Sequence, residues 1–157
     1  MGRFKIITDT REKAELYIPE TDFCYGSVKK KLDTGDYSIE GMEDILCIER
    51  KRSTAEIAQN IAEKRFTDVL ERMSKFKYKF MLCEFTFDDV LSFPINSGIP
   101  KSQHNSLRIN RNYLLKMALK MQIDYGIQFI MVSNKAAATE ILMQLCKNIY
   151  KQETESK

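Results

Sequence analysis

Two carboxylates and a lysine are placed by one short hairpin where they could act together. Asp36 begins the first strand of this hairpin, and Glu49 and Lys51 lie in the second. The connecting residues 40–44 are polar and contain a glycine, as a hairpin turn requires. With the loop at residues 41–44, strand pairing sets Asp36 opposite Glu49, with Cβ atoms about 4.5–5.5 Å apart. Lys51 returns to the same face of the sheet two residues after Glu49.

The chemistry that this arrangement favours is hydrolysis of a phosphodiester. Two adjacent carboxylates repel each other, so one is expected to hold a proton unless a cation binds. Asp36 and Glu49 suit Mg²⁺, which takes one or two carboxylates together with waters and substrate phosphate. A bound metal polarises a phosphoryl oxygen and activates a water, and Lys51 would orient or deprotonate that water. The competing interpretation is a surface hairpin that carries ordinary charges.

The composition predicts one domain over residues 1–157 that is large enough to bury its own core, with residues 151–157 as a frayed tail. Of the 157 residues, 43% are hydrophobic and 30% are charged. The net charge is only +3, but basic residues flank the hairpin or lie on a later predicted helix: Arg50, Lys51, Arg52, Lys64, Arg65, Arg108, Arg111, Lys116 and Lys120. Charge runs are usually solvated faces, but basic residues around a carboxylate–lysine site are what a nuclease groove requires, because phosphate contacts supply most sequence-independent affinity for DNA.

Several other classes of protein are disfavoured by the sequence. The four cysteines form no CxxC pair and are expected to be core residues, and His104 is the only histidine, which excludes histidine-rich metal sites. No apolar run approaches the ~20 residues of a membrane helix. No signal peptide is present, so we expect a cytoplasmic protein. The absence of a glycine-rich phosphate loop predicts no nucleotide cofactor.

The apolar pattern predicts an α/β fold in which a mixed sheet is flanked by helices. Strands are expected at 4–8, 35–39, 46–51, 80–85 and 127–132, and helical periodicity is found at 54–76, 105–124 and 135–150. Residues 13–33 are expected to be irregular with one further strand. The last helix has two neighbouring apolar rows, a surface wide enough for a partner subunit as well as the core.

Four short motifs, at residues 9–12, 35–37, 48–51 and 64–66, follow one another in the order of a known family. The family pattern is Asp-x-Arg-Glu, Gly-Asp-Tyr/Phe, Glu-Arg-Lys and Gly-Arg-Phe/Leu. The sequence thus resembles, over nearly its whole length, the nuclease domain of the XPF family of structure-specific endonucleases, in a compact form most like phage or prophage members. The resemblance implies a restriction-endonuclease-like core and Mg²⁺- or Mn²⁺-dependent cutting of DNA near duplex–single-strand junctions.

The same resemblance assigns roles to the residues of the hairpin. By position, Asp36 and Glu49 are implied to be metal ligands, and Lys51 is implied to be the base that positions the water. Asp9 is implied to be a supporting acidic residue of the catalytic metal site, at the end of an adjacent strand.

The arginines of the motifs are implied to hold phosphates or to brace the site. These are Arg11, Arg50 and Arg65, with Glu12 as the partner of one of them. Strand alternation leaves a second interpretation open for Arg50: it points to the opposite face of the sheet and pairs there with an acidic group such as Glu12 or Glu84.

Three departures from the family pattern are visible. Ala55 replaces an aspartate that often follows Glu-Arg-Lys, and Glu56 is expected to substitute for it with an offset of one residue. Lys64 stands where the family usually has the glycine of Gly-Arg. The tandem helix-hairpin-helix domain of many relatives does not fit into these residues. Because recognition of DNA junctions often relies on that domain, the resemblance alone does not decide whether this protein is specific for junctions.

The sequence therefore predicts a metal-dependent DNA endonuclease that acts at branched or flap and fork structures and dimerises through its C-terminal helices. One alternative is a non-catalytic DNA-binding or dimer-partner module of the same fold. Another is a resolvase or exonuclease built on the same core.

Overall fold

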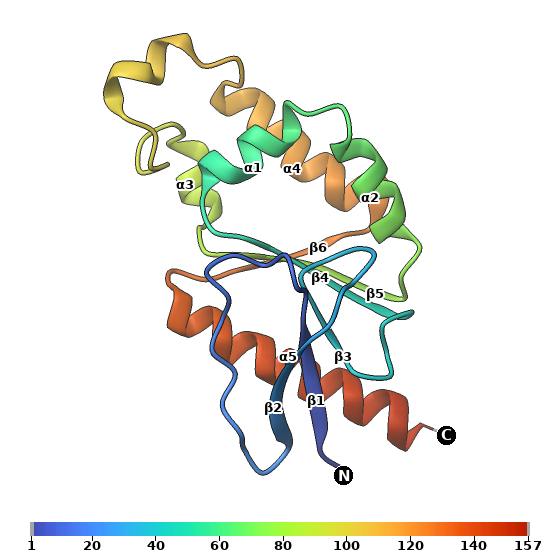
Figure 1. The fold of residues 1–157 in the computed structure, drawn as a ribbon. Helices are drawn as coiled ribbons and strands as arrows, with labels where there is room; N and C mark the ends of the chain where they lie inside the picture. The colour runs from blue at the N-terminus through green and yellow to red at the C-terminus, as the bar shows by residue number, and fades with distance from the viewer. Residues whose placement is uncertain (1, 157) are drawn as a thin grey trace.

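The strands form a single mixed sheet in the computed structural model, which describes residues 2–156 (Figure 1). Their bounds are β1 Phe4–Thr8, β2 Cys24–Lys29, β3 Tyr37–Ile39, β4 Leu46–Lys51, β5 Tyr78–Cys83 and β6 Gln128–Met131. The order across the sheet is β2-β1-β3-β4-β5-β6. Strand β3 runs antiparallel to β1 and β4, whereas the other neighbours are parallel. The predicted mixed sheet is confirmed.

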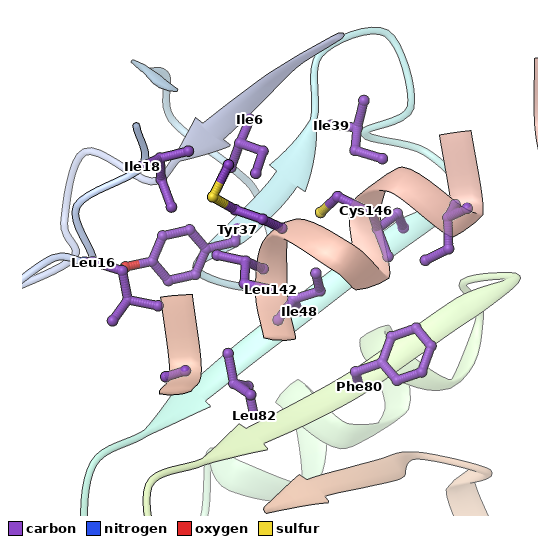
Figure 2. Packing of buried hydrophobic residues seen from close by; sticks show 14 of the residues in the cluster. Ile6, Leu16, Ile18, Tyr37, Ile39, Ile48, Phe80, Leu82, Leu142 and Cys146 are labelled. Carbon is purple, nitrogen blue, oxygen red and sulfur yellow. The ribbon is translucent and has the colours of Figure 1, made fainter. Parts of the chain in front are cut away.

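Helices cover both faces of the sheet (Figure 1). Their bounds are α1 Thr54–Ile61, α2 Phe66–Ser74, α3 Phe87–Leu91, α4 Arg111–Tyr125 and α5 Lys135–Glu155, with a 3-10 helix η1 at Lys101–Ser106. Helix α5 packs on one face, where Leu142 and Cys146 meet Ile48 and Leu82 (Figure 2). The other α-helices pack on the opposite face. Among residues 2–156, no helix is long and apolar enough to cross a membrane.

Strand β4 lies between these two cores and is buried on both faces. Cys47 belongs to the cluster under α1, α2 and α4, and Ile48 belongs to the cluster under α5. Alternation along the strand therefore directs Glu49 and Lys51 to the same side as Cys47. Tyr37 pairs with Ile48, which is the predicted register and sets residue 36 opposite residue 49.

The predicted helix over 54–76 is wrong in one respect, because it is broken into α1 and α2. Two short turns replace helical hydrogen bonds at the break: the Glu63 N–H donates to the Asn60 carbonyl (2.9 Å), and the Phe66 N–H donates to the Glu63 carbonyl (3.1 Å). The change of direction lets Ile57 of α1 and Leu70 of α2 enter the same cluster. No glycine or proline marks the break in the sequence, so the apolar pattern did not reveal it.

Most of the tail that was expected to be frayed is helical in the structure. Helix α5 continues to Glu155, and only Lys157 of the predicted tail lies outside the described residues. The reason is tertiary: Glu153 forms an ion pair with Lys77 and accepts a hydrogen bond from the Tyr78 hydroxyl (2.8 Å). These partners lie at the start of β5 and hold the last turns of the helix against the sheet.

Gly35, immediately before Asp36, is required both by its backbone conformation and by its surroundings. Its φ is +90°, and a Cβ there would lie 2.8 Å from the Cys47 sulfur and 3.2 Å from the Ile48 carbonyl oxygen. Gly41 in the hairpin loop has a similar φ of +88° but open space around it. Substitutions at the two glycines therefore distinguish the cost of backbone strain, which both share, from the cost of steric overlap, which only Gly35 has.

We predict that Gly35→Ala lowers the free energy of unfolding by about 2–4 kcal/mol, whereas Gly41→Ala costs about 1 kcal/mol. Both changes force alanine into a left-handed conformation, but only the first also pushes the two strands of the hairpin apart. Urea unfolding followed by circular dichroism measures both values. Equal losses in the two variants would show that the close approach at Gly35 has no energetic consequence.

Candidate functional site

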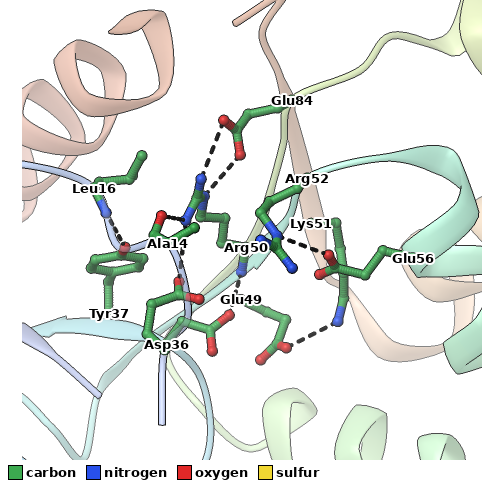
Figure 3. A network of polar contacts seen from close by, with 11 residues as sticks. Ala14, Leu16, Asp36, Tyr37, Glu49, Arg50, Lys51, Arg52, Glu56 and Glu84 are labelled. Carbon is green, nitrogen blue, oxygen red and sulfur yellow. Dashed lines mark hydrogen bonds and ion pairs between the residues drawn. The ribbon is translucent and has the colours of Figure 1, made fainter. Parts of the chain in front are cut away.

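The hairpin brings together the three side chains that the sequence singled out (Figure 3). The Lys51 Nζ lies 3.1 Å from Glu49 Oε1, and Lys51 is only 6% exposed although it carries a charge. The backbone N–H of Arg50 donates to Oδ2 of Asp36 (2.8 Å) across the two strands. This bond fixes the Asp36 carboxylate beside the strand that carries Glu49.

A cavity of about 220 Å³ opens at the two carboxylates. Its lining residues are Asp9, Arg11, Asp33, Thr34, Gly35, Asp36, Glu49, Val69 and Arg72. The acidic residues predicted for the site, Asp36, Glu49 and Asp9, therefore border one space, and two arginines stand at it. Such a mixture of carboxylates and guanidinium groups suits a cation together with a phosphate.

The surroundings of Asp36 disfavour its negative charge. Burial is the main cause that raises the pKa of this carboxyl well above 3.8, and the charges of Glu49 and Glu12 add to it. The Arg50 N–H and the Lys51 ammonium act in the opposite direction and do not outweigh these effects. A divalent cation between Asp36 and Glu49 would remove the repulsion, so this pair fits Mg²⁺ or Mn²⁺.

Asp9 is held by hydrogen bonds of its own. Its oxygens accept from the Leu32 N–H (2.8 Å) and from Nε of Arg11 (2.9 Å). Burial alone would raise the pKa of Asp9, but these hydrogen bonds outweigh it and lower the pKa. Arg11 also donates to the Leu32 carbonyl (2.5 Å). Asp9 and Arg11 thus join the end of β1 to the segment that leads into β3.

Asp36 and Glu49 are therefore the carboxylates best placed to hold a metal. Within residues 2–156, no three histidine, cysteine, aspartate or glutamate side chains are grouped closely enough to form a metal site by themselves. Two carboxylates are sufficient for Mg²⁺, which completes its coordination with water and substrate oxygens. Asp9 supports the cavity wall in this arrangement.

Arg50 points away from the cavity, to the face of the sheet covered by α5. Its guanidinium is bound twice by Glu84 (2.8 and 3.3 Å) and donates to the Ala14 carbonyl (2.8 Å), and Glu12 lies 3.7 Å away. Arg50 is 3% exposed. The interpretation in which Arg50 pairs with Glu12 and Glu84 is therefore what the structure shows, and a direct phosphate contact by Arg50 is excluded in this arrangement.

Glu12 and Tyr37 complete the same buried cluster. Burial is the main cause that raises the pKa of Glu12, and it outweighs the opposing charge of Arg50. The Tyr37 hydroxyl accepts from the Leu16 N–H (2.9 Å), and its influence on the pKa of Glu12 opposes that of burial. Burial raises the pKa of the Tyr37 phenol, so this group stays neutral. The sequence predicted the acidic partner but treated Tyr37 only as packing.

Other predicted site residues lie outside the cavity. Arg65 is bound to Glu63 (2.7 Å) at an exposed position, and Arg52 is bound to Glu56 (3.2 Å) at the start of α1. Lys64 is exposed and does not line the cavity. The carboxylate of Glu56 faces Arg52 (Figure 3), so the structure does not place it beside Asp36.

Arg72 is a cavity residue that the sequence reasoning did not assign. It lies on α2, and its Nε donates to the Thr34 hydroxyl (3.2 Å), 38 positions earlier in the chain. Arg72, Thr34 and Asp33 also border a larger neighbouring hollow of about 650 Å³, which Lys30, Lys31 and Lys75 line as well. One signal in the sequence that could have found it is the spacing of Val69 and Arg72, which places both on one face of α2.

We predict that Asp36→Asn raises the thermal midpoint in the absence of metal at neutral pH. Asparagine removes the disfavoured charge and can still accept the Arg50 N–H. Because the pKa of Asp36 is raised on folding, its ionisation destabilises the folded state increasingly as the pH rises from about 4, the ordinary value, through the raised pKa. The difference between variant and wild type should therefore vanish below about pH 4 and level off at high pH. Differential scanning fluorimetry across this range measures it.

Asp44→Asn in the exposed hairpin loop is the matched control, because it removes the same charge where no burial opposes it. Added Mn²⁺ should raise the midpoint of the wild type and leave Asp36→Asn unchanged. An Asp36→Asn protein that is less stable than the wild type in EDTA at pH 7 would contradict the proposed charge repulsion.

We predict that Arg50→Met lowers the free energy of unfolding by about 3–5 kcal/mol, because Glu84 and Glu12 lose their buried partner. Arg50→Lys should cost less, since one charge remains but the two-pronged contact with Glu84 is lost. Arg52→Met, which breaks an exposed pair two residues away, should stay within about 1 kcal/mol. Chemical denaturation compares the three variants, and an Arg50→Met loss no larger than that of Arg52→Met would refute a bracing role.

Comparison with known proteins identifies the family and the fold of this chain. The family profile of the ERCC4 domain matches residues 8–145. The structure of XPF from Aeropyrum pernix in complex with DNA superposes with a TM-score of 0.67 and 20% identity, over 95% of this chain and 66% of that one.

A second structure of XPF from Aeropyrum pernix gives a TM-score of 0.68 and 18% identity over 97% and 68%. The chain thus spans about two thirds of the length of these proteins, and no curated protein sequence matched. The superpositions confirm the predicted restriction-endonuclease-like fold. The match over most of its length shows that this chain belongs to the ERCC4-domain family, as an XPF-type nuclease domain.

Proposed function

We propose that this domain is a divalent-metal-dependent DNA endonuclease. The observation that carries the proposal is the convergence of Asp36 and Glu49 on one cavity, with the buried ammonium of Lys51 3.1 Å from Glu49. A non-catalytic module of the same fold would have no need for a charged lysine buried beside two repelling carboxylates. The buried lysine and the two carboxylates lower the stability of the fold, and such a loss of stability is typical of residues that are retained for catalysis.

In the proposed reaction, Asp36 and Glu49 hold Mg²⁺ or Mn²⁺. The metal would polarise the scissile phosphate and lower the pKa of a water. Lys51 orients the attacking water and offsets the negative charge that develops on the phosphate. Arg11 and Arg72, which line the same cavity, bind non-bridging phosphate oxygens. Asp9 keeps Arg11 in place through the 2.9 Å hydrogen bond.

Branched DNA, such as a flap or a fork, is the substrate that we propose. The support is family membership, together with one matched structure that is a complex of XPF with DNA. The cavity opens beside a second, larger hollow that shares Arg72, Thr34 and Asp33 with it. These joined hollows offer a path for a strand that leaves the scissile phosphate.

We further propose that two copies associate through the C-terminal elements. Strand β6 lies at an edge of the sheet, and its residues Phe129 to Met131 are only half-buried. The neighbouring helices leave apolar side chains in solvent: Ile123 of α4 is 80% exposed, and Ile141 of α5 is 38% exposed. An edge strand flanked by exposed apolar residues is typical of a surface that pairs with another chain.

We predict that Lys51→Ala lowers the cleavage rate by about 10²–10⁴-fold in Mg²⁺ or Mn²⁺, and that Asp36→Asn abolishes cleavage. Both variants should bind DNA nearly as well as the wild type in EDTA, since these residues act on the reacting phosphate. Labelled flap, fork, splayed-arm and four-way substrates, with a covalently closed circle, test the reaction and separate endonuclease from exonuclease action.

Lys77→Ala is the matched control, because it removes an exposed lysine that pairs with Glu153 and does not line the cavity. Its cleavage rate should equal that of the wild type. Unchanged cleavage by both Lys51→Ala and Asp36→Asn would refute the proposed active site. DNA binding by the wild type without cleavage in any divalent metal would favour a non-catalytic module.

A further inference from the structure

Residues 90–123 contain no acidic side chain. The segment holds five of the 25 basic residues, Lys101, Arg108, Arg111, Lys116 and Lys120, whereas the rest of the chain has 22 acidic residues against 20 basic ones. The net positive charge of the protein therefore resides in this one segment. Single-sign segments of this kind create a local potential that attracts a polyanion.

The segment projects from the helical layer above the sheet. In Figure 1 its central part, the 3-10 helix η1 and the links on either side, stands out beyond α3 and the start of α4. Most side chains from Lys101 to Tyr113 are exposed. We call residues 94–112 the basic arm.

The basic arm is folded and does not have to be ordered by a partner. The Ser97 side chain is 2% exposed, and its hydroxyl accepts from the Ile99 N–H (3.1 Å). The His104 ring nitrogen Nε2 is hydrogen-bonded to the Ile99 carbonyl (2.8 Å). Leu107 and Ile109 pack into the cluster under α1 and α2. A preformed surface loses little entropy on binding.

Most charges of residues 90–123, which include the basic arm, are not neutralised within the described part of the protein. Among residues 2–156, Lys101, Arg108, Arg111 and Lys116 form no ion pair, and only Lys120 pairs, with Asp124 just beyond the segment (3.7 Å). Elsewhere in the chain, basic residues are interspersed with acidic ones and some pair with them: Lys30 lies 2.7 Å from Glu43. An ordinary solvated surface mixes both signs, so the unpaired charges of the arm point to an external anion.

The basic arm packs against α1, the helix that follows the strand carrying Glu49 and Lys51. Helix α1 follows directly after Lys51 at the end of β4, and Ala55 and Ala58 of this helix share a hollow with Leu107, Arg108 and Ile109 of the arm. One helix thus separates the arm from the catalytic cavity. DNA lying across α1 would reach both.

We infer that the basic arm binds the phosphate backbone of duplex DNA next to the cleaved bond. Residues 94–112 contain no phenylalanine, tyrosine or tryptophan, and the one ring of the arm, that of His104, is hydrogen-bonded to the Ile99 carbonyl. The arm therefore lacks the series of aromatic rings on which unpaired bases stack. It instead combines cations with serine, asparagine and glutamine side chains, which are typical of contacts to backbone phosphates. The arm would supply affinity that does not depend on sequence. This inference rests on the proposed function, because the DNA that it holds is the substrate of the site.

The test removes three charges from the arm in one variant, Lys101→Gln with Arg108→Gln and Arg111→Gln. A control variant, Lys29→Gln with Lys147→Gln and Lys151→Gln, removes three charges from β2 and α5, outside the helical layer that carries the arm (Figure 1). Fluorescence anisotropy with a short unbranched duplex in EDTA gives the dissociation constant between about 50 and 200 mM salt. Circular dichroism verifies that both variants fold, and Arg111→Gln alone replaces the triple variant if that one does not.

We expect the arm variant to bind about tenfold to a hundredfold more weakly than the wild type at low salt, because phosphate contacts are lost. The slope of log affinity against log salt should fall by about 0.9 for each lost contact, hence by about 2–3 in total. The control should keep the wild-type slope. Equal losses in the arm variant and the control, or no loss in either, would overturn the inference.

Cleavage by the wild type with Mn²⁺, measured in parallel, distinguishes failure of this inference from failure of the proposed function. If the wild type cleaves DNA and the arm variant keeps its affinity and slope, the inference is wrong and the function stands. If only the arm variant loses affinity and the wild type never cleaves, the arm binds DNA and the proposed function is wrong.

Discussion

The buried pairing of Arg50 with Glu84 is the interaction on which the site depends. Neighbouring residues of a strand point to opposite faces, so the anchoring of Arg50 below the sheet fixes Glu49 and Lys51 above it. The backbone N–H of the same arginine holds Asp36 (2.8 Å). One residue thus braces all three side chains of the candidate site without touching the cavity, which explains why an arginine between Glu49 and Lys51 is useful although it cannot reach the substrate.

Charge is handled in opposite ways on the two faces of β4. On the face under α5, the Arg50 guanidinium compensates Glu84 and lies 3.7 Å from Glu12, where burial still raises the pKa of that carboxyl. On the cavity face, burial and the Glu49 charge raise the pKa of Asp36 well above its ordinary value, and Lys51 offsets this only in part. The first face stabilises the fold, and the second stores an unfavourable interaction that a cation relieves. This asymmetry supports the proposal that the cavity face is the functional one.

The sequence predicted the features that depend on neighbouring residues. The turn and the alternation of the hairpin gave the Tyr37–Ile48 register, and with it the meeting of Asp36, Glu49 and Lys51. Features that depend on distant contacts were missed. The break between α1 and α2 has no glycine or proline to announce it, and Arg72 reaches the cavity only because α2 packs beside a loop 38 positions earlier. The last turns of α5 are ordered by β5, which no local pattern in residues 151–156 could indicate.

The separation of binding from catalysis follows from electrostatics. In the proposed reaction, the carboxylates of Asp36, Glu49 and Asp9 repel the phosphates of DNA, and Arg11 divides its hydrogen bonds between phosphate, Asp9 and the Leu32 carbonyl. Most of the affinity for a polyanion is therefore expected to come from elsewhere on the surface. Residues 90–123 meet this need because their cations have no acidic neighbours in the segment and lie one helix away from Lys51. In this proposal, their separation from the carboxylates keeps their charge available for DNA, while the carboxylates of the cavity remain available for the metal.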